Sequence, residues 1–471
     1  VFPKPVRRGL TTASLLMLAL AWPLASPAER VVQDLTGSGG TNAPAHLGKP
    51  SVVVLSLDGF RHDYMARYET PFLDEIARRG VRAEALVPAF PSLTFPSHYS
   101  IATGLAPGRH GIVANRFLDP ATGRRFSLRD RETVEDGWWY GGEPIWVTAE
   151  SQGMVTSAFY FVGTEADVRG VRPSDWRPFD MDVPGEVRVD QVLEWLAAPP
   201  ATRPHLVTLY LGQVDRAGHQ HGPDSLETAA AVAEVDALVG RLLAGIDRLS
   251  ETEPVYVVVV SDHGMMSYVE EPPRFVIDDV IDMEGIRTGV GGPVMFLYLD
   301  DPARAPAIRD ALNEAWTHGR AWLSEETPAA WGVAGNPRFG DVILTADPGH
   351  AVVAGWLRDA RLPVGSHGWS SDTPEMHGIF LAVGPGFPAG RVLPPVDVVD
   401  VYPLLARLLG LDPAADLDGS PAALADRLLP LPDTRPAAPK RHLHAALTRV
   451  SRGLHRHLAT FSGTEFQGTG G

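Results

Sequence analysis

The chain has 471 residues, of which 44% are hydrophobic and 21% are charged, and it contains no cysteine. Disulfides, iron–sulfur clusters and thiolate metal sites are therefore excluded, and the length predicts a large globular domain with an insertion or a second lobe. The formal net charge of −16 argues against binding to nucleic-acid duplexes through a basic surface, so an anionic ligand would need a local source of positive charge such as bound metal ions.

The first 28 residues have the pattern of a secretory signal. Basic residues precede an apolar run at 15–22, and a small-residue cleavage site ends at Ala28. The alternative is an uncleaved membrane anchor, for which the apolar run is short. We expect cleavage, export to a periplasm or to the extracellular medium, and no stable membrane span afterwards. Residues 29–49, rich in Gly, Ala, Thr and Asn, are expected to form a flexible leader.

Alternating strand and helix patterns predict a first part of a catalytic core over residues 50–265. Apolar, β-branched runs typical of strands buried on both faces fall at 51–57, 155–161, 206–211 and 255–260. Helical patterns lie between them, at 70–79, 143–151, 189–196 and 226–249. This alternation predicts an α/β fold, with a mostly parallel central sheet covered by helices on both faces.

The pattern changes over residues 266–374, where Pro, Gly and Trp are frequent and the predicted strands are shorter. Two strands at 294–299 and 352–356 are separated by a helix at 306–316. We interpret this segment as an inserted cap subdomain.

The core is expected to resume over residues 375–430. A strand is predicted at 378–383, and a packing helix at 398–409. The remaining residues, 431–471, form a Pro-rich and then basic tail with no obvious core partner, which predicts either disorder or a loosely docked helix.

Three aspartates, Asp58, Asp215 and Asp262, stand at or within a few residues of the ends of three predicted buried strands. Ligands bind at the carboxyl ends of strands in open α/β sheets, so these carboxylates are candidates for one site. A single Asp in such a position commonly caps the following helix. Three of them, each close to a glycine, are harder to attribute to capping.

Histidines accompany these aspartates. His263 adjoins Asp262, His219 lies four residues after Asp215, and His377 immediately precedes the last predicted core strand. Asp and His together with water are the ligand set for zinc. For most other histidines an ordinary hydrogen-bonding role is expected: His62, His98, His110, His205, His221, His318, His350 and His367. Of these, His98 is a candidate to support a ligand, and residues 365–369 are expected to position a loop.

The stretch 88–115 is too apolar and too rich in Pro and Gly for an ordinary loop. Thr94 precedes Phe95-Pro96, and residues 97–103 have the pattern of the first turns of a helix. A hydroxyl there would lie beside unpaired backbone N–H groups, which favour an anion. A lone Thr is more often a helix cap, so the hypothesis of a nucleophile depends on the Asp and His residues elsewhere.

Several motifs follow one another along the chain: Leu57-Asp58-Gly59, Leu93-Thr94-Phe95-Pro96 with His98-Tyr99, Gly111-Ile112-Val113 with Asn115, Asp215-x-x-x-His219, Asp262-His263-Gly264-Met265 and Met376-His377-Gly378. In this order and density they resemble the nucleotide pyrophosphatase/phosphodiesterase family of the alkaline phosphatase superfamily. The resemblance covers roughly residues 51–411 and is weakest in the predicted cap.

Residue by residue, the resemblance implies two zinc ions. One would be held by Asp58, Thr94, Asp262 and His263, and the other by Asp215, His219 and His377. It also implies that Thr94 attacks phosphorus and forms a phospho-threonine intermediate, which a metal-activated water then hydrolyses. The side-chain amide of Asn115 and the backbone N–H of Phe95 would hold a non-bridging phosphate oxygen.

The resemblance further implies that Phe95, Phe179 and Tyr210 stack a nucleobase, although aromatic residues in an α/β chain usually belong to the core. Phe179 stands where several relatives carry Tyr. Ser97 replaces an Asn that is common in the family, and Thr133 falls where some relatives have a Lys near the nucleotide. These departures concern the preference for nucleotides rather than the chemistry.

The sequence therefore predicts an exported two-zinc phosphodiesterase acting on a small-molecule phosphodiester or nucleotide pyrophosphate and releasing a nucleoside 5′-monophosphate. Alternatives are hydrolysis of choline-type phospholipid esters or glycerophosphodiesters, or of phosphomonoesters. A sulfatase is disfavoured because Thr94-Phe95-Pro96 continues into Ser97-His98 instead of the x-Arg that a sulfatase carries. A non-catalytic metal-holding protein is a remote alternative, since it requires a missing ligand and every predicted ligand position is filled.

Overall fold

The computed structural model describes residues 39–249, 254–269, 274–333 and 335–429. The predicted signal at 1–28, residues 29–38 of the predicted leader and the tail at 431–471 lie outside these ranges. Among the described helices, none combines the length and the apolar character that a membrane crossing requires.

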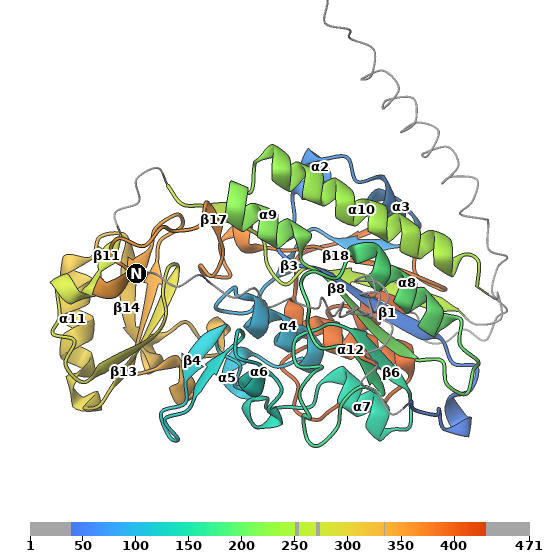
Figure 1. Cartoon of the computed structure of the whole chain (residues 1–471), viewed down its shortest axis with the longest axis horizontal. Helices are drawn as coiled ribbons and strands as arrows, with labels where there is room; N and C mark the ends of the chain where they lie inside the picture. Colours follow the sequence, from blue (N-terminus) through green and yellow to red (C-terminus); the bar gives the residue numbers. More distant parts are fainter. Residues whose placement is uncertain (1–38, 250–253, 270–273, 334, 430–471) are drawn as a thin grey trace, which may run out of the picture.

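An eight-stranded sheet forms the centre of the fold (Figure 1). Its strands lie in the order β19 (Arg391–Leu393), β2 (Val81–Ala83), β18 (Phe380–Val383), β9 (Val255–Val260), β1 (Ser51–Leu57), β8 (Leu206–Leu211), β6 (Thr156–Phe159) and β7 (Asp175–Trp176). In this described sheet β18 is the one strand that runs antiparallel to its neighbours. The prediction of a mostly parallel α/β sheet is confirmed.

The central strand β1 shows why the sheet is buried on both sides. All seven of its residues are buried. Val52 and Val54 belong to one apolar cluster, whereas Val53, Leu55 and Leu57 belong to another on the opposite face. Because successive side chains of a strand point to opposite faces, a continuous apolar run is stable only between two covering layers. Each such side chain contributes roughly 1.5–3 kcal/mol when fully buried.

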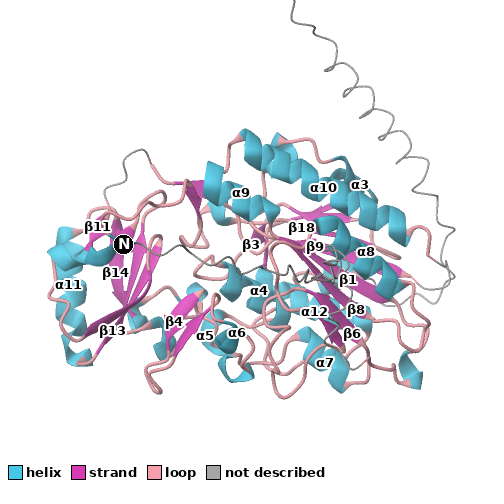
Figure 2. Ribbon diagram, in the orientation of Figure 1, coloured by secondary structure: helices cyan, strands magenta, loops and turns pink. Residues whose placement is uncertain are grey.

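Helices provide these two layers (Figure 2). One face is covered by α3 (Pro71–Arg79), α8 (Gly185–Leu196), α9 (Gln213–His221) and α10 (Leu226–Ile246), and the other by α4 (Thr94–Thr103), α7 (Ile145–Ser151) and α12 (Val401–Leu409). The helix predicted at 189–196 begins four residues earlier, at Gly185, with Pro184 as its N-cap residue.

A second, four-stranded antiparallel sheet lies at one end of the molecule (Figure 1). Its order is β12 (Ile286–Val290), β13 (Val294–Leu299), β15 (Val342–Ala346) and β14 (Gly319–Leu323), and α11 (Ala305–Ala315) packs against β14. These elements all fall within the segment predicted as a cap, whose boundaries stay a prediction. The strand predicted at 352–356 is shorter, since β16 (Val352–Val353) gives way to a 3₁₀ turn at Gly355–Leu357.

The remaining elements are short. They comprise four two-stranded ribbons and four helices: β3 (Leu86–Val87) with β20 (Val396–Asp397), β4 (Arg116–Leu118) with β5 (Arg125–Ser127), β10 (Met266–Ser267) with β17 (Gly365–Ser366), β11 (Phe275–Val276) with β16, α2 (Tyr64–Arg67), α5 (Pro107–His110), α6 (Arg131–Val134) and α13 (Ala425–Leu428). Of these, the ribbon of β10 and β17 matters most for the site described next.

Candidate metal centre

Three carboxylates meet at the carboxyl ends of the central strands, as the sequence predicted. Asp58 directly follows β1, Asp262 lies two residues after β9, and Asp215 lies in the first turn of α9. Gly59 permits this approach, because it has a positive φ of 69° and a Cβ there would lie 2.8 Å from the Cα of Asp215. The backbone N–H of Asp215 also donates to the carbonyl of Asp58 at 3.1 Å.

Thr94 lies at the start of α4 and is not its cap. The N-cap residue is Leu93, and the structure records no side-chain hydrogen bond that caps this helix. The Thr94 hydroxyl instead lies 3.2 Å from Nε2 of His263. The ten-residue helix α4 begins at Thr94, so the partial positive charge of its N-terminus lies beside that hydroxyl.

Three histidines present the same nitrogen to the carboxylates. His219, His263 and His367 each direct Nδ1 to a backbone carbonyl, and these carbonyls belong to Gly365 at 2.8 Å, Gly264 at 2.9 Å and Ser92 at 2.9 Å. A carbonyl only accepts, so each Nδ1 carries a proton, and Nε2 is the ring nitrogen left to face the carboxylates. This orientation is the one that metal-binding histidines adopt.

The Nε2 atoms point at carboxylate oxygens that have no other partner. His263 Nε2 lies 3.5 Å from Asp58 Oδ1, and Asp215 Oδ1 lies 3.4 Å from His219 Nε2 and 3.7 Å from His367 Nε2. Asp58 Oδ1 and Asp215 Oδ1 are buried oxygens that accept no hydrogen bond from the described residues. Asp262 Oδ2 is also buried, and it lies 3.1 Å from both His263 Nε2 and His98 Nδ1. Because a buried unpaired carboxylate is strongly destabilising, this arrangement fits bound cations.

Two overlapping sets of residues could hold such cations. Asp215, His219 and His367 form one set, and Asp58, Asp215 and His263 form the other, with the candidate ligand atoms of each set within 4.8 Å of one another. Oxygen and imidazole donors without sulfur suit zinc among the common divalent ions.

A third set, formed by Asp58, Asp262 and His98, meets the same distance criterion, but His98 has other partners. Its Nδ1 donates to the carbonyl of Thr94 at 2.9 Å and also lies 3.1 Å from Oδ2 of Asp262, and its Nε2 lies 2.7 Å from the hydroxyl of Ser56. The side chain is fully buried. His98 therefore holds the segment that carries Thr94, and both of its ring nitrogens already have partners.

The electrostatics of the three carboxylates also favour a cation. Burial raises the pKa of Asp58 well above its usual value, with Asp262 as the next contribution, and burial raises the pKa of Asp215 to about 6. Although burial opposes it, the charges of His263 and His98 hold the pKa of Asp262 well below its usual range. Carboxylates that repel one another in a buried pocket are relieved by a shared metal ion.

His377, predicted as the third ligand beside Asp215 and His219, does not join them, and this prediction is corrected. Its Nε2 lies 2.9 Å from the carbonyl of Ser371, and its ring lies 5.8 Å from that of His62. His367 lies beside Asp215 and His219 instead.

The ribbon of β10 and β17 explains why. Met266, which follows His263 closely along the chain, pairs with Ser366, and this pairing brings His367 back over the strand ends. The ring of His367 stacks on that of His263 with centroids 3.5 Å apart. The sequence held a signal for this residue, because Ser366-His367-Gly368 repeats the polar-His-Gly pattern of Asp262-His263-Gly264.

The residues predicted to hold a phosphate oxygen lie together. The backbone N–H of Phe95 donates to Oδ1 of Asn115 at 3.0 Å. The ring of Phe95 packs against Phe126, with centroids 5.6 Å apart, and is not among the residues that line the cavity beside Phe179.

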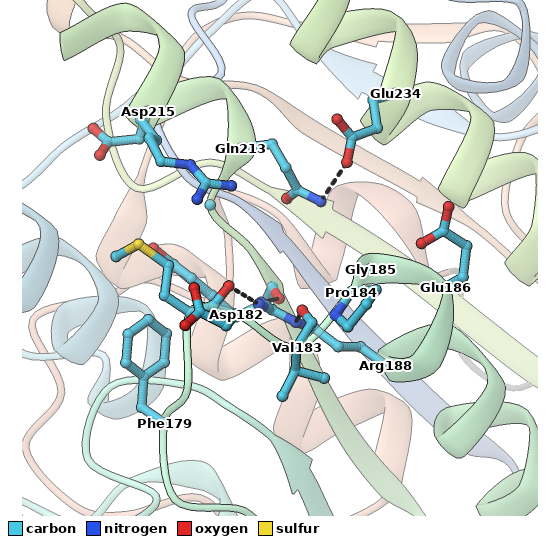
Figure 3. Close-up of a pocket in the computed structure, with 14 residues that line it drawn as sticks. Phe179, Asp182, Val183, Pro184, Gly185, Glu186, Arg188, Gln213, Asp215 and Glu234 are labelled. Carbon is cyan, nitrogen blue, oxygen red and sulfur yellow. Dashed lines mark hydrogen bonds between the residues drawn. The ribbon is translucent and has the colours of Figure 1, made fainter. Parts of the chain in front are cut away.

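That cavity, of about 290 Å³, opens next to Asp215 (Figure 3). Phe179 and Tyr210 line it, with ring centroids 5.9 Å apart, and the side chain of Phe179 is 40% exposed. Arg188 fastens one wall, since its buried guanidinium donates to the carbonyls of Val183 and Tyr210 at 3.0 Å each. The hydroxyl of Tyr210 donates a hydrogen bond to Oδ2 of Asp58 at 2.6 Å.

Comparison with known proteins places this site in a known class. The family model for type I phosphodiesterase / nucleotide pyrophosphatase matches residues 52–370. The chain is 32% identical over 431 residues to an uncharacterized pyrophosphatase/phosphodiesterase of Schizosaccharomyces pombe, covering 88% of each chain. It is also 32% identical over 442 residues to human ectonucleotide pyrophosphatase/phosphodiesterase family member 7, covering 91% of each. Against mouse family member 1, with 32% identity, it spans only 44% of the longer relative.

Solved structures of the same family also superpose on this chain. Murine ectonucleotide pyrophosphatase/phosphodiesterase 5, as a threonine-to-alanine variant reported as inactive and in complex with AMP, superposes with a TM-score of 0.76 and 30% identity, covering 81% of this chain and 100% of that one. The fold and site thus define a metal-dependent hydrolase of the alkaline phosphatase superfamily. Within it, the chain belongs to the type I phosphodiesterase/nucleotide pyrophosphatase family.

Proposed function

We propose that this protein is a two-zinc phosphodiesterase that hydrolyses phosphodiester or pyrophosphate bonds of nucleotides and releases a nucleoside 5′-monophosphate. The observation that carries the proposal is the set of three buried carboxylate oxygens beside the Nε2 atoms of three histidines, next to the hydroxyl of Thr94. One ion would be held by Asp58, Thr94, Asp262 and His263, and the other by Asp215, His219 and His367. Bound zinc lowers the pKa of a coordinated hydroxyl or water and offsets developing negative charge.

The residues of the chain divide the chemistry as follows. Thr94 attacks phosphorus through Oγ1 and releases its hydroxyl proton to solvent, and the bond to the leaving oxygen breaks with its electron pair on that oxygen. Water then attacks the phospho-threonine, so that the phosphate leaves as the monophosphate product and Oγ1 of Thr94 regains its proton. The backbone N–H of Phe95, which donates to Asn115 in the free protein, turns to a non-bridging phosphate oxygen together with the Asn115 amide.

A nucleotide fits the surroundings of the metal centre. Phe179 presents a partly exposed ring at the wall of the adjacent cavity, which suits stacking on a base. The AMP complex of the murine relative supports a nucleotide ligand. A second candidate is a phosphodiester with a cationic substituent, such as choline, because three carboxylates besides Asp215 line the same cavity: Asp182, Glu186 and Glu234.

A substrate panel tests the proposal. Purified protein with added zinc is assayed against ATP, the nitrophenyl ester of thymidine monophosphate, lysophosphatidylcholine and nitrophenyl phosphate. ATP and the thymidine nitrophenyl ester are expected to be hydrolysed fastest, and Thr94→Ala is expected to lose about 100-fold or more in kcat/KM. Preference for lysophosphatidylcholine would favour the second candidate. Undiminished activity of Thr94→Ala would overturn the assignment of the nucleophile. Two bound zinc ions without turnover of any substrate would favour the non-catalytic alternative.

We also propose that the chain is exported, on the strength of the signal pattern in residues 1–28. Expression of the full sequence in a bacterium with a periplasm is expected to give a mature protein that starts near residue 29 in the periplasmic fraction. Mass spectrometry of the N-terminal peptide checks this, and an unprocessed chain confined to the cytoplasm would contradict it.

A further inference from the structure

Tyr210 lines the cavity beside Phe179 and makes one hydrogen bond to an aspartate of the candidate metal centre. Its hydroxyl donates to Oδ2 of Asp58 at 2.6 Å, whereas Oδ1 of Asp58 has no hydrogen-bond partner among the described residues. Asp58 is only 1% exposed, so water does not compete for either oxygen. The hydroxyl therefore decides which oxygen of Asp58 is left free.

From this we infer that Tyr210 is a positioning residue for the metal centre: its hydroxyl occupies Oδ2 of Asp58 and so directs Oδ1 to the bound ion. The inference depends on the proposed metal centre. Partners of this kind orient ligands, fix their charge distribution and change metal affinity about 10- to 100-fold when they are removed.

The sheet explains how Tyr210 reaches Asp58. Strands β1 and β8 are parallel neighbours in which Ser56 pairs with Tyr210. Side chains two residues apart along an extended chain project to the same face, so Asp58 lies on the face that carries Ser56 and Tyr210. Tyr210 is also the one residue of β8 that is not fully buried. Its ring reaches the cavity and its hydroxyl reaches the strand end.

Two roles of Tyr210 are therefore separable by chemistry. The ring lines the cavity next to Phe179, and the hydroxyl holds Asp58. Substitution to Phe removes the hydroxyl and keeps the ring. If the hydroxyl acts on the metal, zinc affinity falls and the binding of an aromatic substrate does not.

Tyr160 offers a matched control. It is another tyrosine, 3% exposed, whose ring contacts Phe179 with centroids 5.0 Å apart. Tyr160→Phe removes a hydroxyl from the same aromatic cluster without touching Asp58.

The experiment is a competitive zinc titration against a chromophoric chelator, with wild-type protein, Tyr210→Phe and Tyr160→Phe. One of the two zinc ions is expected to bind about 10- to 100-fold more weakly to Tyr210→Phe, and Tyr160→Phe is expected to match the wild type. At saturating zinc, the KM of Tyr210→Phe for the thymidine nitrophenyl ester is expected to stay within about twofold of wild type, since the ring is intact.

If folded Tyr210→Phe binds zinc as tightly as the wild type, the inference is overturned. If its KM is raised while its zinc affinity is unchanged, Tyr210 acts only by contact with substrate. Thermal unfolding checks the fold of each variant. Should Tyr210→Phe not fold, Tyr210→Leu, which also lacks the hydroxyl, is titrated in its place, with the same weakening expected. Wild-type protein that binds no zinc would overturn the proposed metal centre, and this inference with it, whereas zinc binding that is equal in all the proteins overturns the inference alone.

Discussion

His263 and His367 stack face to face beside the carboxylates, with ring centroids 3.5 Å apart and planes 13° from parallel. Each ring is fixed by an Nδ1 hydrogen bond to a backbone carbonyl. Since His263 belongs to one candidate metal set and His367 to the other, the stack joins the two halves of the centre. Burial holds the pKa of His367 well below its usual value, whereas the charge of Asp262, although burial opposes it, raises the pKa of His263 to about 10, so a metal ion would take the place of a proton on His263.

The first prediction separates His367 from His377. His367→Ala is expected to lose one of two zinc ions and about 100-fold or more in kcat/KM, because it removes a ligand beside Asp215. His377→Ala is expected to keep both ions and to stay within a few-fold of wild-type activity. It loses the contacts with the Ser371 carbonyl and with the ring of His62, at a cost of about 1 kcal/mol in stability. Elemental analysis after gel filtration and steady-state kinetics check both variants. The opposite outcome would restore His377 as the ligand.

A second prediction concerns Phe179. Its backbone N–H donates to the buried Glu165 at 2.9 Å, so the loop is held while the ring remains partly exposed. Phe179→Ala is expected to raise KM for the thymidine nitrophenyl ester about 10- to 100-fold, which is the size of one lost stacking contact. The small ester methyl nitrophenyl phosphate serves as the control, because it has no base to stack and its KM should not change. An equal rise in KM for both esters would show that Phe179 does not contact the base.

How far the sequence predicts this centre depends on how local the signal is. Asp58, Asp215 and Asp262 could be found because buried strands have a recognisable pattern and ligands gather where such strands end. The start of α4 was placed three residues late, since the helix begins at Thr94 and admits Pro96 in its first turn.

The local signal did not separate the two candidate ligands, because His367 and His377 are each followed by a glycine. His377 was the natural candidate because it immediately precedes the predicted core strand, but its orientation is set by Ser371. The placement of His367 depends on the pairing of β10 with β17, two short segments far apart along the chain. The hydroxyl contact of Tyr210 is equally non-local, because it follows from the register between β1 and β8.

A third prediction uses Asp236 on α10, which is 2% exposed and accepts hydrogen bonds from the backbone N–H groups of Phe72 at 3.2 Å and Leu73 at 2.8 Å. It thereby caps α3 from another helix, since the N-cap residue Thr70 makes no side-chain cap bond. Burial raises the pKa of Asp236 from 3.8 to about 6, in spite of these hydrogen bonds.

The sign of the pH effect follows. A carboxyl whose pKa is higher in the folded than in the unfolded protein stabilises the fold fully below about pH 4 and loses that contribution as pH rises through about 6. Relative to the non-titrating Asp236→Asn, wild-type protein is expected to lose roughly 3 kcal/mol of unfolding free energy between pH 4 and pH 7. Urea unfolding of both metal-free proteins at several pH values measures this difference. A difference that does not change with pH would show that the folded and unfolded pKa values are equal.

The last prediction concerns His98, which lies fully buried between Ser56 and the carbonyl of Thr94. His98→Leu fills similar volume but leaves the Ser56 hydroxyl and the Thr94 carbonyl unpaired, at about 1–3 kcal/mol each, so that the segment carrying Thr94 is less firmly held. It also removes the contact of Nδ1 with Oδ2 of Asp262 at 3.1 Å. We expect a fall in kcat of roughly 10-fold or more with two zinc ions still bound, because His98 is not a ligand. His98→Asn carries an amide nitrogen near the position of Nδ1, so it can still donate to the Thr94 carbonyl and is expected to recover most of kcat. If both variants lose a zinc ion, His98 is a ligand after all, and if Asn rescues no better than Leu, the hydrogen bond to Thr94 has no role in catalysis.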